Sequence, residues 1–184
     1  PVIDVVEPTG YNNLFVAPAT LDLAGVEQEM RSIISREMRL KRALESVEGE
    51  FEVVFIDCPP SLGLITINAF AAATDIIVPV QAEFYALEGL TQLRKIVTLV
   101  QSNLNPSLKI SKVILTMYDR RVALAQDVAK EVRNHFPSEL CETFVPRSVR
   151  LAEAPSYGQP ITVYDPSSPG AKAYRKLSEE IMNG

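Results

Sequence analysis

Residues 75–117 read DIIVPVQAEFYALEGLTQLRKIVTLVQSNLNPSLKISKVILTM, and this stretch decides the fold class. Its two apolar runs, residues 75–80 and 110–117, are typical of buried strands. Residues 87–101 between them are predicted to form a helix, and Pro106 lies beyond its end, where a proline is expected. The order strand, helix, strand predicts a parallel pair of strands joined by a right-handed crossover.

The alternation of strand and helix continues on both sides of this stretch. Further strands are predicted at residues 14–18, 50–57 and 143–145. Further helices are predicted at residues 24–47, after Pro60, at 123–135 and at 174–182. Strands that alternate with helices predict an α/β fold, a mainly parallel β-sheet with helices on both faces, in one domain of residues 1–184.

Composition narrows the class of protein. The chain has 184 residues and 20.3 kDa, with 47% hydrophobic and 22% charged residues, which is typical of a globular domain. It contains no run of about 18 apolar residues, so no membrane span is predicted. Its two cysteines, Cys58 and Cys141, cannot build a disulfide framework or a metal cage, which favours a reducing, cytoplasmic location.

Charge is distributed unevenly along the chain. The net charge is −5, which argues against a protein that binds polyanions over its whole surface. Residues 1–90 carry 5 basic and 14 acidic side chains, whereas residues 91–184 carry 13 basic and 9 acidic ones. The second half could therefore present a local basic face, or simply a solvated surface of mixed charge.

The strand ends are the places to look for a site, because ligands of parallel α/β sheets bind at the carboxyl edge. Asp57 closes an apolar run, so it could hold Mg²⁺ as a Walker B aspartate does, or merely cap the next helix or begin a turn. The only histidine, His135, lies near a helix end and is not expected to be catalytic. No Ser-His-Asp or Cys-His set can be assembled around it.

Arginines follow the last two predicted strands, at positions 120, 121, 147 and 150. If both loops lie on one edge, four guanidinium groups could gather there, and their planar donors suit phosphates. The alternative is that these arginines pair with acids nearby in the sequence, such as Asp119, Glu142 and Glu153.

Several segments together resemble the ParA/Soj family of chromosome- and plasmid-partition ATPases. The stretch FEVVFIDCPPSLG at 51–63 resembles the Walker B segment of that family, and QAEFYALEGL at 81–90 resembles its next strand-to-helix segment. LTMYDRR at 115–121 is similar to the segment near the nucleotide base. VPRSVRLAEAPSYGQP at 145–160 is similar to the most distinctive stretch of the family. The resemblance covers nearly the whole chain.

The resemblance implies a P-loop NTPase-like three-layer α/β/α fold that binds ATP and Mg²⁺. Asp57 takes the catalytic and magnesium-binding position in this comparison. For nucleotide binding it implies Met117, Asp119, Pro146 and Arg147. Of these, Met117 and the loop of Pro146 and Arg147 would frame the adenine.

The resemblance also implies an ATP-driven homodimer that binds DNA without sequence preference. Arg121 and Arg150 match the DNA-contacting arginines of the family. Binding of that kind is mostly neutralisation of phosphates and should depend steeply on salt. The implied partner is a ParB-type centromere-binding protein that triggers hydrolysis. The implied location is the cytoplasm, in association with the nucleoid and not with a membrane.

One departure from the family pattern is large. The family opens with a strand and a loop of the form Lys-Gly-Gly-x-Gly-Lys-Thr, whose amides cradle the phosphates, and no such segment occurs here. The second acidic motif of the family is also absent. We therefore expect residue 1 to fall well after the phosphate loop, the fold to be incomplete at its N-terminus, and these residues alone neither to bind ATP tightly nor to hydrolyse it. The strands that remain must close the gap, leave an edge or pair with another chain.

Three other functions stay open at this point. A chain without the phosphate loop could be a non-catalytic interaction module that acts as a decoy. Cell-division-site positioning ATPases share the fold, but they carry a C-terminal membrane helix, and residues 171–182 have few bulky apolar side chains and balanced charge. An enzyme with a nucleotide cofactor on a Rossmann-like sheet would need a G-x-G-x-x-G motif after a strand, which this sequence lacks.

Overall fold

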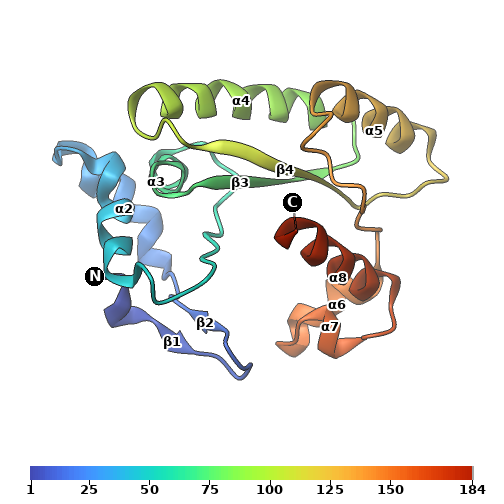
Figure 1. The fold of residues 1–184 in the computed structure, drawn as a ribbon, viewed down its shortest axis with the longest axis horizontal. Helices are drawn as coiled ribbons and strands as arrows, with labels where there is room; N and C mark the ends of the chain where they lie inside the picture. Colours follow the sequence, from blue (N-terminus) through green and yellow to red (C-terminus); the bar gives the residue numbers. More distant parts are fainter. Residues whose placement is uncertain (184) are drawn as a thin grey trace. The chain divides into compact units, whose positions relative to one another are not determined.

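The computed structural model describes residues 1–183, apart from the side chains of Leu21, Ala24 and Arg31. The chain divides into two compact units (Figure 1). Unit 1 contains residues 1–74 and 95–109, and unit 2 contains residues 75–94 and 110–184. Each unit is described by itself.

Unit 1 begins with a small hairpin and a series of short helical turns. The strand predicted at residues 14–18 is present as β2 (Phe15–Val16), which pairs antiparallel with β1 (Glu7–Pro8). The helices and 3-10 turns of this part are η1 (Val2–Val5), η2 (Leu21–Gly25), α1 (Val26–Glu29), η3 (Met30–Ser32), η4 (Arg36–Met38), α2 (Arg39–Leu44) and η5 (Glu45–Val47).

The single helix predicted at residues 24–47 is therefore wrong. The structure interrupts it at Ile33, which has an extended backbone, and at Ser35, which has a left-handed φ of 55°. Ile33 and Ile34 are both β-branched, and such side chains lose rotamer freedom in a helix. The apolar residues whose spacing suggested one helix instead lie on several short helical turns.

The strand predicted at residues 50–57 is also wrong, because residues 51–59 form neither a helix nor a strand. Their apolar side chains are not buried as a central strand would require. Val53, Val54 and Phe55 are 46%, 51% and 75% exposed. Strand propensity reflects packing against neighbouring strands, and the described residues supply no strand beside this segment.

The helix predicted after Pro60 is present as α3 (Leu64–Ala72). Near its start the amide of Ile65 donates to a carboxylate oxygen of Glu27 over 3.4 Å, which suits the positive end of a helix. At its other end the buried amide of Asn105 donates to the carbonyls of Phe70 at 2.9 Å and of Ala73 at 2.7 Å. Asn105 therefore fixes the C-terminal end of α3 to residues 95–109 of the same unit.

The sheet of unit 2 contains β3 (Asp75–Gln81) and β4 (Lys109–Thr116), joined by α4 (Ala86–Asn103). The Ser111 hydroxyl reaches the carbonyl of Ile76, and the Thr116 hydroxyl reaches that of Val80. The later residue of β4 is bonded to the later residue of β3, so the two strands run parallel. The strand–helix–strand unit predicted at residues 75–117 is thus confirmed.

A third segment runs parallel to β4, as predicted for residues 143–145. The amides of Cys141 and Val145 donate to the carbonyls of Val113 and Leu115 over 2.9 and 2.8 Å. The pairing consists of single bridges at Leu140 and Pro146 and not of a continuous strand. The strand prediction is therefore right about direction and place but not about regularity.

Helices cover both faces of this sheet (Figure 1). Val113 and Leu115 pack with the start of α4 and with α5 (Ala123–His135), whereas Ile114 packs on the other face with Leu177 of α8 (Pro169–Met182). Successive residues of a strand point to opposite faces, so an unbroken apolar run is what a covered sheet needs. The layers helix, sheet, helix agree with the predicted fold class.

The chain between the sheet and α8 forms α6 (Val149–Glu153), η6 (Ala154–Tyr157) and α7 (Ile161–Tyr164). Ala154, Ile161 and Ala171 form a small buried cluster there. Within the described residues, no helix combines the length and apolarity that a membrane crossing requires.

Candidate functional site

Three strand ends meet at one edge of unit 2. The amide of Ala82, just after β3, donates to Thr116 at the end of β4 over 3.2 Å. The amide of Tyr118 donates to Val145 over 3.1 Å, and Tyr118 pairs with Pro146 in a parallel bridge. The loops predicted to hold a ligand are therefore neighbours at the carboxyl edge, where parallel α/β folds bind one.

A hollow of about 310 Å³ lies at this edge. Its lining consists of Tyr118, Asp119, Arg120, Arg121, Pro146 and Arg147. Three of the four residues predicted for nucleotide binding thus share one cavity with one arginine predicted for DNA binding. Met117, the fourth, is the residue just before this lining.

Met117 has a left-handed backbone with φ of 52°, and it is 45% exposed. That region is uncommon for a side chain without special stabilisation, and such residues are concentrated at functional sites. The turn at Met117 follows β4 directly and leads into Tyr118, whose ring packs edge-to-face on Phe144 at 4.8 Å between centroids.

Asp119 binds Arg121 through three hydrogen bonds. The carboxylate accepts from the Arg121 backbone amide at 2.9 Å, from Nε at 3.0 Å and from Nη2 at 2.7 Å. These bonds, those from the guanidinium foremost, lower the pKa of Asp119 to about 2. Arg121 nevertheless keeps 85% of its side chain exposed, so it can still reach a partner in solvent.

Arg147 is paired across the same edge with Glu83, which follows β3. The distance from Nη2 to Oε1 is 3.3 Å, and the two side chains are 66% and 58% exposed. Exposed pairs of this kind stabilise a fold weakly and exchange easily for other partners. The sequence did not indicate this pairing, because 64 residues separate the two positions.

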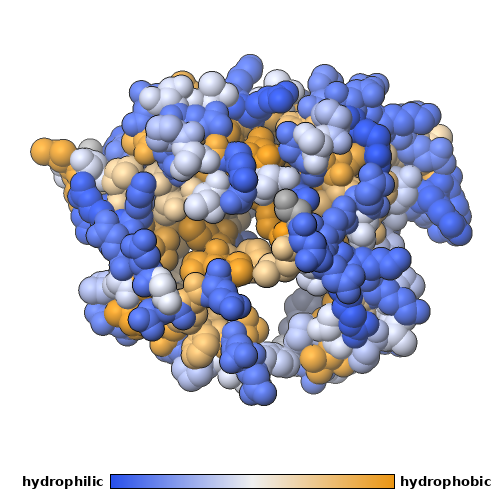
Figure 2. Space-filling view, viewed as in Figure 1, coloured by the Kyte–Doolittle hydropathy of each residue, from blue (hydrophilic) through white to orange (hydrophobic). Residues whose placement is uncertain are grey.

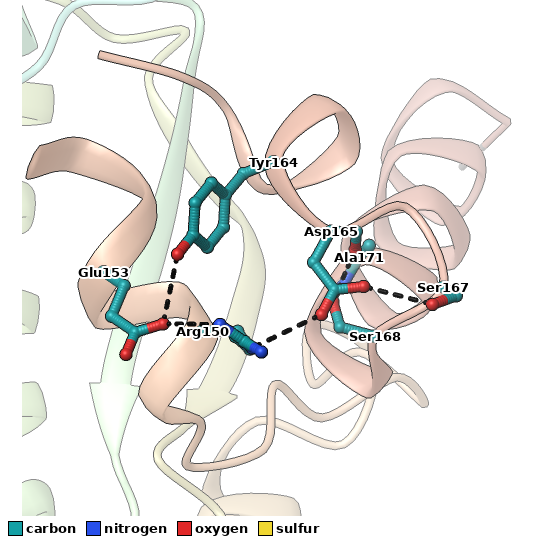
Figure 3. A network of polar contacts seen from close by, with 7 residues as sticks. All are labelled: Arg150, Glu153, Tyr164, Asp165, Ser167, Ser168 and Ala171. Atoms are coloured by element: carbon teal, nitrogen blue, oxygen red, sulfur yellow. Dashed lines mark hydrogen bonds and ion pairs between the residues drawn. The ribbon is translucent and has the colours of Figure 1, made fainter. Parts of the chain in front are cut away.

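Arg150 lies in a polar network at the start of the C-terminal helices (Figure 3). Its Nη1 is 3.0 Å from Glu153, and its Nε is 3.6 Å from Asp165. The Tyr164 hydroxyl donates to the same Glu153 oxygen over 3.2 Å. The hydrogen bond with Glu153, followed by that with Tyr164, raises the pKa of Arg150. The side chain of Arg150 remains 58% exposed.

The network is continuous with the N-terminal cap of α8 (Figure 3). Asp165 accepts a hydrogen bond from Ser167, and its carbonyl accepts one from Ser168. The Ser168 hydroxyl in turn accepts from the amide of Ala171, which satisfies one of the free donors of the helix. Arg150 is therefore held by residues that also fix the beginning of α8.

Comparisons with known proteins identify the family. Residues 1–110 match the AAA domain family. The chain is 52% identical over 180 residues to the sporulation initiation inhibitor protein Soj of Bacillus subtilis, covering 98% of this chain and 71% of that protein. It is 47% identical over 182 residues to the chromosome partitioning protein ParA of Myxococcus xanthus, covering 99% of this chain and 64% of that protein.

The chain belongs to the ParA/Soj family of chromosome-partitioning ATPases. It spans about two thirds of the length of these relatives. The fold agrees with that of a protein described as cobyrinic acid a,c-diamide synthase from Mycobacterium smegmatis with bound ADP and magnesium, with a TM-score of 0.82, 34% identity and coverage of 98% of this chain and 66% of that one. The cell-division ATPase MinD of Pyrococcus furiosus shares the fold, with a TM-score of 0.77, 24% identity and coverage of 99% of this chain and 70% of that one.

Asp57, the predicted magnesium ligand of this ParA/Soj-family chain, lies in unit 1 and is exposed. Magnesium is usually bound through one or two carboxylates together with waters and substrate phosphates. A single exposed carboxylate can supply one of the ligands of Mg²⁺, but it cannot supply the whole coordination shell. Among the described residues, no three acids, histidines or cysteines lie close enough to form a metal site.

Glu180 supports the site, and sequence analysis missed it. Its carboxylate, on α8, accepts hydrogen bonds from the backbone amides of Glu142 and Thr143, the latter at 3.1 Å. It thereby fixes the extended segment that leads to Pro146. Sequence analysis predicted the C-terminal helix, but the spacing of its residues gives no sign that one acid on it binds backbone amides.

Proposed function

We propose that this chain acts in chromosome or plasmid segregation as a ParA/Soj-type ATPase that dimerises with ATP and binds DNA without sequence preference. The observation that carries the proposal is the shared hollow of unit 2. Asp119 and Pro146, assigned to the nucleotide, line it together with Arg121, assigned to DNA. A nucleotide base and a DNA phosphate would therefore be bound by adjacent residues of one loop.

In this proposal Asp57 is the catalytic and magnesium-binding carboxylate, while Met117, Pro146 and Arg147 frame the adenine. Pro146 suits that role because its ring fixes the backbone beside the Tyr118 bridge. The sequence contains no Lys-Gly-Gly-x-Gly-Lys-Thr loop. We therefore propose that the 184 residues by themselves neither bind ATP tightly nor hydrolyse it, and a turnover clearly above background for this polypeptide would contradict that statement.

Arg121 and Arg150 are the proposed DNA contacts. Both are exposed, and both are paired with carboxylates of their own loop or helix. A DNA phosphate can replace such a carboxylate, because an exposed pair is weak and a duplex offers closely spaced negative charges. We propose that a ParB-type protein at centromere-like DNA triggers turnover, and that the protein works in the cytoplasm on the nucleoid.

The test is a DNA titration of the complete gene product, with and without ATP, over a series of salt concentrations. Arg121→Glu and Arg150→Glu should each abolish binding, and Lys176→Glu, an equal charge reversal at an exposed position of α8, should leave most of it. If both arginine variants bind as the unmodified protein does, the assignment of these two residues is wrong. If the unmodified protein binds no DNA in either state, the proposed function itself fails.

We propose a non-catalytic decoy of the same fold as the second candidate. It predicts binding to the ParB-type partner without any response to ATP. A cell-division-site ATPase is less well supported, because Leu177 and Ile181 of α8 pack against the sheet of unit 2 and are not available to a membrane.

A further inference from the structure

A second hollow, of about 330 Å³, lies next to the first in unit 2. The two share Tyr118 and Arg120 in their linings. The floor of the second hollow is apolar and half-buried, and consists of Tyr118, Ala129 and Phe144. Its rim is polar, and consists of Arg120, Gln126, Lys130 and Arg133.

The rim follows one face of α5. Gln126, Lys130 and Arg133 are spaced by four and three residues, which places them on one side of a helix. With a rise of about 1.5 Å per residue, they cover roughly 10 Å along the helix axis. The opposite side of α5 packs in the core through Val128 and Val132, so the polar face must point outward.

Figure 2 shows that hydrophilic residues gather over α5, at the upper right of the view. We call the row of Arg120, Lys130 and Arg133 the basic stripe. Arg120, at the start of the basic stripe, is exposed and has no ion pair with any residue that the structure describes. Arg120 is also adjacent to Arg121, so the basic stripe continues the surface already proposed for DNA.

The two cations on α5 have only weak partners. Lys130 is 3.8 Å from Asp127, with both side chains at least 70% exposed. Arg133 is 3.1 Å from Glu142, which is 78% exposed. A phosphate that replaces either carboxylate breaks a solvent-exposed pair, which costs little.

We propose that the basic stripe is a second part of the DNA-binding surface, in which Arg120, Lys130 and Arg133 contact the phosphate backbone of duplex DNA. This inference rests on the proposed function. Two cations on one helix, with Arg120 in the loop just before it, suit phosphates that recur along a strand. Phosphate contacts position a protein without reading sequence. Within the apolar floor, the rings of Tyr118 and Phe144 pack edge-to-face with 4.8 Å between their centroids.

The stripe predicts a defined change in salt dependence. The slope of log K against log salt is negative, and each phosphate contact increases its magnitude by about 0.9. We expect Arg120→Gln, Lys130→Gln and Arg133→Gln each to reduce the magnitude of this slope by about 0.9, and the triple variant to reduce it by about 3. The measurement is a titration of the complete gene product, with ATP and Mg²⁺, using linear duplex DNA of mixed sequence at several salt concentrations.

Two sets of controls accompany these variants. Lys172→Gln and Lys176→Gln remove equal charge from exposed positions of α8 and should leave the slope unchanged. Asp127→Asn and Glu142→Gln remove the carboxylates that compete with the phosphates, so they should tighten binding. Circular dichroism of each variant checks that the fold is retained.

The possible outcomes separate the two proposals. If the unmodified protein binds no DNA, the proposed function fails and this inference with it. If it binds DNA and the triple variant keeps the same slope, only the inference is overturned. The inference is likewise overturned if the triple variant retains DNA binding in full but loses binding to poly-glutamate, since the stripe would then suit an acidic polypeptide. A reduced slope in the triple variant, with unchanged α8 controls, supports the inference.

Discussion

Glu180 provides the sharpest test of how the site is supported. Its carboxylate accepts two backbone hydrogen bonds from the segment that leads to Pro146. Hydrogen bonds to a charged group typically stabilise by about 1.5–3 kcal/mol each, and this site is only partly buried. We therefore expect Glu180→Ala to lower the free energy of unfolding of unit 2 by about 1–3 kcal/mol in total. Glu179→Ala, at the exposed neighbouring position of α8, is the matched control and should change it little.

The same carboxylate predicts a pH dependence. Burial raises the pKa of Glu180, but the amides of Glu142 and Thr143 outweigh it, so the pKa lies below its ordinary value of 4.5. A group with a lowered folded pKa stabilises fully above its unfolded pKa, and the contribution is lost as the pH falls through the folded pKa. The stability difference between Glu180→Ala and the unmodified chain should therefore be constant near neutrality and shrink in acid.

Urea unfolding followed by tyrosine fluorescence suits this measurement, because the chain contains six tyrosines and no tryptophan. Native-state hydrogen exchange adds a local readout, since the Glu142 and Thr143 amides should lose protection in Glu180→Ala. If Glu180→Ala is as stable as Glu179→Ala and both amides remain protected, the two hydrogen bonds do not hold this segment.

Three further changes test the packing inside each unit. Leu115→Ala removes a fully buried side chain between β4 and α5 and should cost about 2–5 kcal/mol in urea unfolding. Asn105→Ala leaves two carbonyls at the end of α3 without their buried donor and should cost about 1–3 kcal/mol, with amide exchange increased around α3. Gly170→Ala should lower the Tm although alanine favours helices, because the new Cβ would lie 2.8 Å from Cγ of Leu151; an increase in Tm would show that Leu151 moves aside freely.

The elements predicted best from the sequence are those whose pattern and packing agree. α5 spans the residues that were predicted, 123–135, because its apolar side faces the sheet and its polar side faces solvent. Val113, Ile114 and Leu115 form an unbroken apolar run because both faces of β4 are covered by helices. In these cases the local signal and the tertiary contacts favour the same structure.

The two wrong predictions share a physical cause. Each was inferred from a local residue pattern, whereas the structure of the segment depends on its contacts with other parts of the chain. Residues 24–47 have helical spacing, yet the backbone of Ser35 turns left-handed and divides the segment. Residues 50–57 have the composition of a buried strand, but a strand is stable only with partners for its backbone groups. No feature within either segment reports whether such partners are present.

At the candidate site, the sequence likewise indicated which residues lie after the strands, but their contacts are known only from the structure. The position of four arginines after two strands indicated either a phosphate surface or pairing with nearby acids. The structure pairs Arg121 with Asp119 and Arg150 with Glu153, as that alternative predicted, but the sequence could not show that both guanidinium groups stay exposed. Asp119 matters most here, because it lines the proposed base site and also binds Arg121. A variant at Asp119 would therefore disturb nucleotide and DNA contacts together and could not assign either. Lys130 and Arg147 lie on only one hollow each, so changes at these positions can separate the two kinds of binding.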